Sequence, residues 1–163
     1  MGDMSEAAAL PTSISQRLEL YRQIVVEVMR KNNLEDADVA RGTTIGRNHI
    51  GKVRRGERKL TADALDMIID SLGLDRQRLA FAVDIMGDPA CYFDATFQKT
   101  CIFTHAILVN TVQMTKEGGG LSAGVLMASL SPERCESLAS EHVSRLREQF
   151  ARVNSGFMLQ QTG

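Results

Sequence analysis

The sequence predicts an all-α protein in two parts, a set of five short helices over residues 16–88 and a further helical region over residues 89–163. Three observations predict this. Apolar residues recur at three- and four-residue steps along most of the chain. Residues that favour helix starts and ends interrupt that pattern at short intervals. After Pro89 the composition shifts to long apolar stretches with few charges. Residues 1–15 are small and polar, and we expect a flexible arm.

The first two helices follow from apolar spacing and from their ends. A stripe from Leu18 to Met29 begins near Ser15, and the pair Asn32–Asn33 can end the helix with a left-handed residue. A second short helix begins near Leu34, where acids favour a helix N-terminus. Gly42 is predicted to end it.

Three more helices complete the first part. The third is predicted over residues 46–54, with Ile50 and Val53 facing inward and Gly56 after its end. Thr61 is a good N-cap for the fourth helix, which Gly73 stops. The fifth is predicted over residues 76–86, and it ends at the Gly-Asp-Pro of residues 87–89.

The second part contains two long apolar patterns. Residues 92–116 are apolar over most of a helical circumference, so we expect a helix that is buried on several sides. Its many β-branched residues leave a strand as the alternative, although the alternation is poor. A last helix is predicted from Ser131 as N-cap and Pro132 as first residue to about Asn154.

Composition narrows the class of protein. Three cysteines, an odd number, do not suggest a disulfide framework, and we therefore expect a reducing, cytoplasmic location. The chain has no secretory signal pattern and no run of 18 apolar residues, so no membrane span is expected. No P-loop, GxGxxG or GxSxG motif has a recognisable context, so no enzyme and no cofactor is predicted.

Charge is distributed very unevenly. Residues 41–59 hold seven basic residues and one acid, whereas the whole chain has a net charge of −1. Such a concentration suggests a polyanionic partner, and the alternative is a solvated charged face. Ile45, Ile50 and Val53 lie within the same segment and are expected to be buried.

Residues 18–74 resemble the helix-turn-helix domain of XRE-type, phage-repressor-like transcriptional regulators. The spacing agrees without a gap from Leu34 to Leu74. The matching positions are Leu34, Val39, Ala40, Ile45, Ile50, Val53, Gly56, Thr61, Leu72, Gly73 and Leu74.

The resemblance implies that the helix near residues 46–54 lies in the major groove of double-stranded DNA. Its outward side chains are expected to contact bases: Arg47, Asn48, His49 and Lys52. Flanking side chains are expected to contact phosphates: Thr43, Thr44, Arg54, Arg55, Arg58 and Lys59.

The chain departs from the family pattern at three positions. Thr44 occupies the place of a glycine in the turn, so the turn geometry is expected to differ. Asp36 lies where the family often has a phosphate-contacting glutamine, and an acid there would repel phosphate. Leu60 replaces a common proline and is expected to affect packing alone.

The second part is expected to pair two copies of the chain, since two half-sites bind more tightly than one. The expected dimerisation residues are Phe97, Ile102, Phe103, Leu108, Leu146 and Phe150. An intramolecular core is the alternative use of these residues. This part is also a candidate site for a small-molecule or protein effector.

The spacing of Cys101 and His105 gives only weak support for a metal, and no metal site is predicted. A redox role for Cys91, Cys101 or Cys135 would need an exposed thiol of low pKa.

Two functions of different classes follow. The first is a homodimeric, sequence-specific repressor of a phage-like or bacterial operon that reads a palindromic operator. The second is an antitoxin-like or adaptor protein whose C-terminal half binds another protein.

Overall fold

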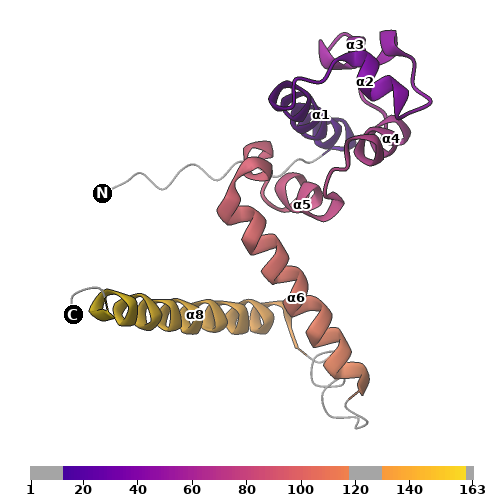
Figure 1. Ribbon diagram of the computed structural model, residues 1–163. Coiled ribbons are helices and arrows are strands. Elements are labelled where there is room, and N and C mark those ends of the chain that lie inside the picture. Colours follow the sequence, from indigo (N-terminus) through magenta and orange to yellow (C-terminus); the bar gives the residue numbers. More distant parts are fainter. Residues whose placement is uncertain (1–12, 118–129, 161–163) are drawn as a thin grey trace. The chain divides into compact units, whose positions relative to one another are not determined.

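The computed structural model describes residues 13–117 and 130–160, and every regular element within these ranges is helical (Figure 1). The predicted all-α class is therefore confirmed for the described part of the chain. The α-helices are α1 (Ile14–Lys31), α2 (Asp36–Arg41), α3 (Arg47–Arg54), α4 (Ala62–Leu72), α5 (Arg76–Ala80), α6 (Ala95–Glu117) and α8 (Pro132–Gln160). A π-helical turn spans Phe81–Ile85 and a 3₁₀-helix spans Pro89–Phe93.

Helix α1 begins with a reciprocal cap at Ser13. The Ser13 hydroxyl accepts from the Gln16 backbone N–H at 3.2 Å, and the Gln16 side chain accepts from the Ser13 N–H at 3.0 Å. Ile14 and Ser15 are therefore helical, which corrects the end of the predicted arm, and residues 1–12 lie outside the described ranges.

The ends of the next helices follow the predicted signals. Asn33 has φ 51° after α1, and Gly56 has φ 76° after α3. The Thr61 hydroxyl accepts from the Ala64 N–H at 3.3 Å and caps α4, which Gly73 ends with φ 61°. These local predictions are confirmed.

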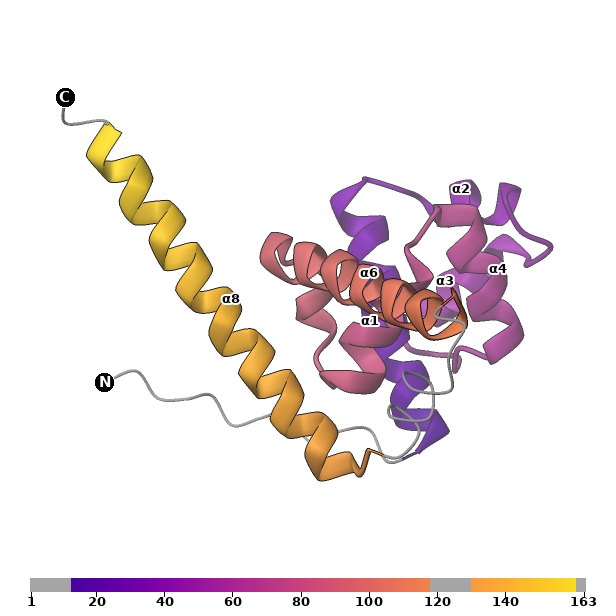
Figure 2. The same cartoon turned by 90° about the horizontal axis from the view of Figure 1, so that it is seen from below.

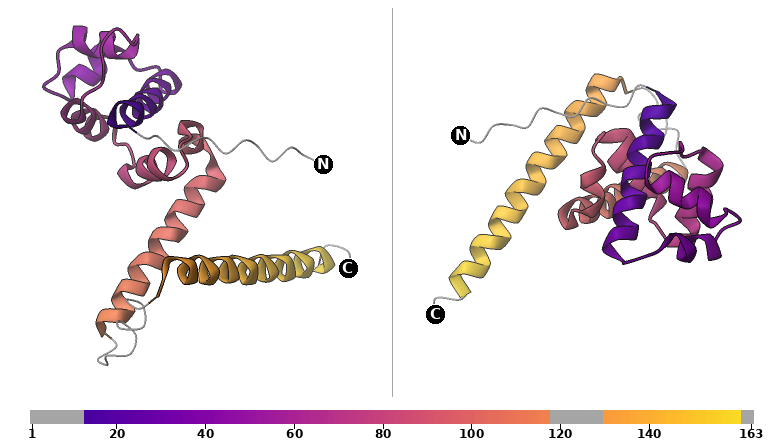
Figure 3. Two further views of the ribbon diagram at one scale, coloured as in Figure 1. Left: turned by 180° about the vertical axis from the view of Figure 1, so that it is seen from behind. Right: turned by 90° about the horizontal axis from the view of Figure 1, so that it is seen from above.

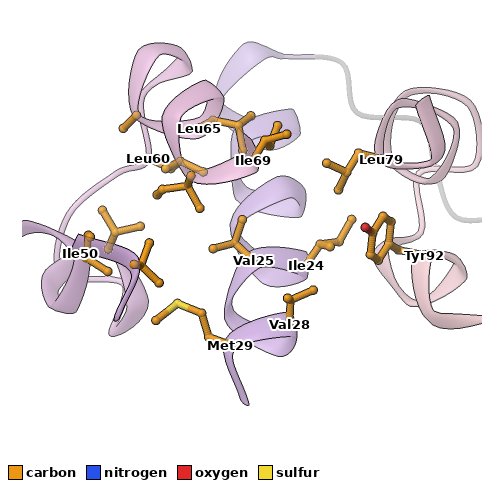
Figure 4. Packing of buried hydrophobic residues seen from close by; sticks show 14 of the residues in the cluster. Ile24, Val25, Val28, Met29, Ile50, Leu60, Leu65, Ile69, Leu79 and Tyr92 are labelled. Atoms are coloured by element: carbon orange, nitrogen blue, oxygen red, sulfur yellow. The ribbon is translucent and has the colours of Figure 1, made fainter. Parts of the chain in front are cut away.

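The core of the first part is organised around α1, whose Ile24 is fully buried. Figure 4 shows Ile50 of α3 and Leu65 of α4 on one side of α1, and Leu79 and Tyr92 on the other. The apolar stripe of α1 thus holds together the helices before and after residue 75, and it fixes α3 on the surface of the bundle.

The first compact unit extends further than predicted. The chain divides between Ile107 and Leu108, rather than at residue 88. The reason is that Tyr92 is buried in the core and its hydroxyl accepts from the Asp75 N–H at 3.3 Å. Phe97 also packs against this core.

The predicted fifth helix is α-helical in its first half and π-helical in its second half. Helix α5 covers Arg76–Ala80, and the chain continues as the π-helical turn. Asp84 of that turn accepts from Arg17 at 2.8 Å and from the Tyr21 hydroxyl at 3.0 Å. The turn thereby places a carboxylate over the start of α1.

Within the single chain, the described side chains of α6 are not buried on several sides, and their burial against a second copy stays a prediction. Cys101 is buried in α6, but Ile102 is 54% exposed and Leu108 is 58% exposed. The first unit covers only the early turns of α6.

Helix α8 begins as predicted, since the Ser131 hydroxyl accepts from the Arg134 N–H at 3.3 Å. It continues beyond Asn154 to Gln160, and Figures 2 and 3 show it as one unbroken helix.

Candidate nucleic-acid interface

Helix α3 has one buried and one exposed side. Ile50 and Val53 are 2% and 3% exposed and pack into the core, while Arg47, Asn48 and Lys52 are exposed. The apolar residues of the basic segment therefore hold the helix on the bundle, and the polar ones remain accessible.

An arginine of α1 ties down the end of α3. The Arg22 guanidinium donates to the carbonyl of Arg54 at 3.2 Å and, over a longer 3.4 Å, to that of Val53. Carbonyls at a helix C-terminus lack partners within the helix, and a cation there also suits the helix dipole. Glu19 orients the guanidinium through bonds of 2.6 and 2.8 Å. No local sequence pattern predicts this contact, because its residues lie 31 and 32 positions apart.

His49 departs from the predicted base-contacting set. The residue is half-buried, and its Nε2 atom is shielded from solvent without a hydrogen-bond partner among the described residues. In this conformation Nε2 does not face solvent, whereas the side chains of Arg47, Asn48 and Lys52 are exposed, and the base contacts of all four residues stay a prediction.

The predicted phosphate-contacting arginines next to α3 are held by carboxylates. Arg54 Nε lies 3.2 Å from Asp36 Oδ1. Arg55 donates to both carboxylate oxygens of Glu57, at 2.6 and 3.2 Å, and this pairing lowers the pKa of Glu57.

Four cations of the segment remain without such a partner. Within residues 13–117 and 130–160, no ion pair involves Arg47, Lys52, Arg58 or Lys59. All four side chains are exposed. The cationic surface is thus made of α3 and the loop that follows it.

The two threonines before α3 are engaged within the chain. The Thr43 hydroxyl donates to the Val39 carbonyl and accepts from the Ile45 N–H, both at 3.2 Å. The Thr44 hydroxyl lies 3.1 Å from the Met67 sulfur. Thr43 therefore shapes the turn, and a phosphate bond from its hydroxyl would compete with these contacts.

The turn between α2 and α3 uses Gly42 for close packing. Its φ is −88°, which any residue can adopt. A Cβ at this position would lie 2.1 Å from the Ser71 hydroxyl of α4, so a larger residue would require the Ser71 side chain to move. Thr44 is not among the residues of positive φ in the described ranges. The departure at Thr44 thus creates no left-handed strain.

Cysteine and metal chemistry gain no support from the described residues. Burial raises the pKa of both Cys91 and Cys101, so their thiols are protonated at neutral pH. Cys135 is exposed. Gln77 Nε2 lies 2.7 Å from His105 Nδ1, and no group of three potential metal ligands occurs in the described ranges.

An open groove of about 330 Å³ lies between α1, α4 and α5. Its floor is apolar, with Leu18, Leu65 and Ile69, and charged side chains line its rim. It belongs to the first unit, whereas the effector site was predicted in the second half, and that prediction stays untested.

The predicted dimerisation residues fall into different environments. Phe97 is half-buried and packs against the core of the first unit, and its role in dimerisation stays a prediction. Ile102, Phe103 and Leu108 are exposed by 54%, 44% and 58%. Leu146 is half-buried, and the side chain of Phe150 lies outside what the structure describes.

Comparison with protein-family models, curated proteins and solved structures gave no match. In the described residues, no helix is both long enough and apolar enough to cross a membrane.

Proposed function

We propose that this chain is a sequence-specific DNA-binding transcriptional regulator that inserts α3 into the major groove. The observation that carries the proposal is the two-sided character of α3. Its apolar side is fixed in the core, and Arg47, Asn48 and Lys52 share the accessible side. An α-helix fits the major groove, where arginine and lysine match guanine and asparagine matches adenine.

The charge pattern around α3 supports the same proposal. Arg58 and Lys59 follow the helix in an exposed loop and have no carboxylate partner among the described residues. Cations directly after a helix in the major groove are suited to contact DNA phosphates. Such contacts set the register and orientation of the protein on the duplex. A protein that neutralises several phosphates binds DNA with a steep dependence on salt.

We further propose that the regulator binds as a homodimer through α6. Over 23 residues α6 carries only three charges, Lys99, Lys116 and Glu117, and it exposes Ile102, Leu108 and Val109. The fully buried centre of a protein interface is poor in charged residues. These residues point in several directions around the helix, which suits packing against more than one neighbour.

Titration of fluorescent duplex DNA with the purified full-length chain tests the proposal, at a series of salt concentrations. The proposal predicts saturable binding whose affinity falls steeply with salt, because cations of α3 and its loop displace counterions. Absence of duplex binding even at low salt would overturn it, and the apolar surface of α6 would then indicate a protein partner.

A further inference from the structure

The most unusual side chain near the cationic surface is the acid Asp36. It is the first residue of α2, and its side chain is only 15% exposed. A buried or half-buried carboxylate is costly unless it is paired. Its location beside a surface rich in arginine and lysine therefore needs an explanation.

The contacts of Asp36 lead to α3. Its Oδ1 lies 3.2 Å from Arg54 Nε, in an ion pair without hydrogen-bond alignment. Its Oδ2 lies over Gly51, where an added Cβ would come within 2.7 Å of that oxygen. Gly51 is buried at the α2–α3 contact, so the absence of a side chain there makes room for the carboxylate.

The basic residues of this surface fall into two groups, those that are paired with a carboxylate and those that are not. Arg47, Lys52, Arg58 and Lys59 are open, whereas Arg54 is ion-paired with Asp36 and Arg55 with Glu57. A phosphate that approached Arg54 would have to compete with Asp36 and would also be repelled by it. Arg54 thus contributes less to binding of the DNA phosphate backbone than its positive charge suggests.

We propose that Asp36 limits the affinity of the protein for DNA by occupying Arg54 as an internal substitute for a phosphate. The effect should be similar on specific and random duplexes, since phosphate contacts carry no sequence information. Asp36 thereby lowers the overall affinity for DNA and its dependence on salt. This inference rests on the proposed function.

The test compares Asp36→Asn with wild-type protein on specific and random duplexes over a salt series. We expect Asp36→Asn to bind random duplex about two- to fivefold more tightly, the range of a partly exposed ion pair. The salt slope should steepen by about 1, because one more cation contacts phosphate. Glu35→Gln is the matched control: it removes the same charge one residue away, where no ion pair is formed within the described residues, and should change both quantities less.

The double variant Asp36→Asn/Arg54→Ala shows whether Arg54 transmits the effect. The gain from Asp36→Asn should vanish in the Arg54→Ala background. Gly51→Ala is a second route that retains the acid, since the new Cβ displaces the carboxylate. Gly51→Ala should therefore also bind duplex more tightly than wild-type protein. Circular dichroism checks that each variant is folded.

The outcomes separate the two proposals. If no protein of the series binds duplex at low salt, the proposed function and this inference both fall. If wild-type protein binds duplex but Asp36→Asn binds equally or more weakly, Asp36 does not act as proposed. The same follows if the gain in affinity from Asp36→Asn persists in the Arg54→Ala background. In both cases the proposed DNA-binding function stands.

Discussion

At the scale of single residues, the proposed function assigns base contacts to α3 and phosphate contacts to the loop after it. Arg47 lies in the first turn of α3, and Arg58 lies in the loop after it. Because only base contacts distinguish sequences, the two arginines should differ in what their removal changes.

Replacement of Arg47 by alanine should cost about 1–3 kcal/mol on the selected site and relax the preference for one base. Arg58→Ala should weaken specific and random duplexes alike and reduce the salt slope by about 1. Binding isotherms on both duplexes measure these effects. Equal losses on the two duplexes for Arg47→Ala would show that Arg47 contacts only phosphate.

Tyr21 gives a prediction about pH. Burial, and then its hydrogen bond to Asp84, raises the pKa of Tyr21 to about 12. Between the ordinary value near 10 and this value, the unfolded chain has lost the phenol proton and the folded chain retains it. The contribution of Tyr21 to stability is therefore complete below pH 10 and declines as the pH rises toward 12.

Comparison of wild-type protein with Tyr21→Phe checks this by urea unfolding at several pH values. At pH 7 the variant should be less stable by about 1 kcal/mol, the usual contribution of a hydrogen bond. The difference should shrink above pH 10. A difference that stays constant through pH 11 would contradict the assignment.

At the scale of elements, α3 is held by contacts from α1, and the turn before α3 packs against α4. Arg22 satisfies carbonyls at its end, and Gly42 lets the preceding turn approach Ser71. Each contact joins residues far apart in the chain.

Arg22→Ala should lower the free energy of unfolding by about 1–3 kcal/mol, since hydrogen bonds from a charged donor to helix-end carbonyls are lost. Arg30→Ala is the matched control on the same helix. Arg30 has the same type of pair with Glu27, but its side chain is 69% exposed. Its loss should cost much less than the loss of Arg22, because an exposed ion pair contributes little to stability. Similar effects of the two substitutions in thermal unfolding would show that Arg22 does not anchor α3.

The elements show what local sequence can predict. Asn33, Thr61 and Gly73 act through bonds or dihedral angles within a few residues, and the sequence predicts their roles correctly. The role of Gly42 depends on Ser71, 29 positions later, and no local pattern reveals it. For the same reason, the prediction of Asp36 as a phosphate-repelling acid did not include its pairing with Arg54.

At the scale of the whole molecule, the two predicted parts differ from the observed units. Tyr92 and Phe97 were assigned to the second part but belong to the first core. Composition changes at Pro89, yet burial depends on where the chain packs. The sequence predicts the apolar content of α6 correctly, and the single chain leaves much of that surface exposed.

The exposed apolar residues of α6 predict a homodimer in solution. Ile102→Glu should convert it to a monomer, because a charge in an apolar interface is desolvated without a partner. Ile85→Glu is the control, since Ile85 lies in the π-helical turn outside α6 and is 58% exposed, compared with 54% for Ile102. Sedimentation velocity measures the oligomeric state of both variants and of the wild-type protein. A monomeric wild-type protein at micromolar concentration would rule out this use of α6.

Selection of bound duplexes from a random-sequence library, followed by sequencing, tests the central claim most directly. The salt concentration should be about 150 mM, since the affinity of such an interface depends on it. We predict a palindromic motif whose half-sites lie about one helical turn apart, as expected for two copies of α3 in successive major grooves. Weak, salt-sensitive binding without any motif would contradict sequence-specific recognition and reduce the basic segment to a non-specific anchor.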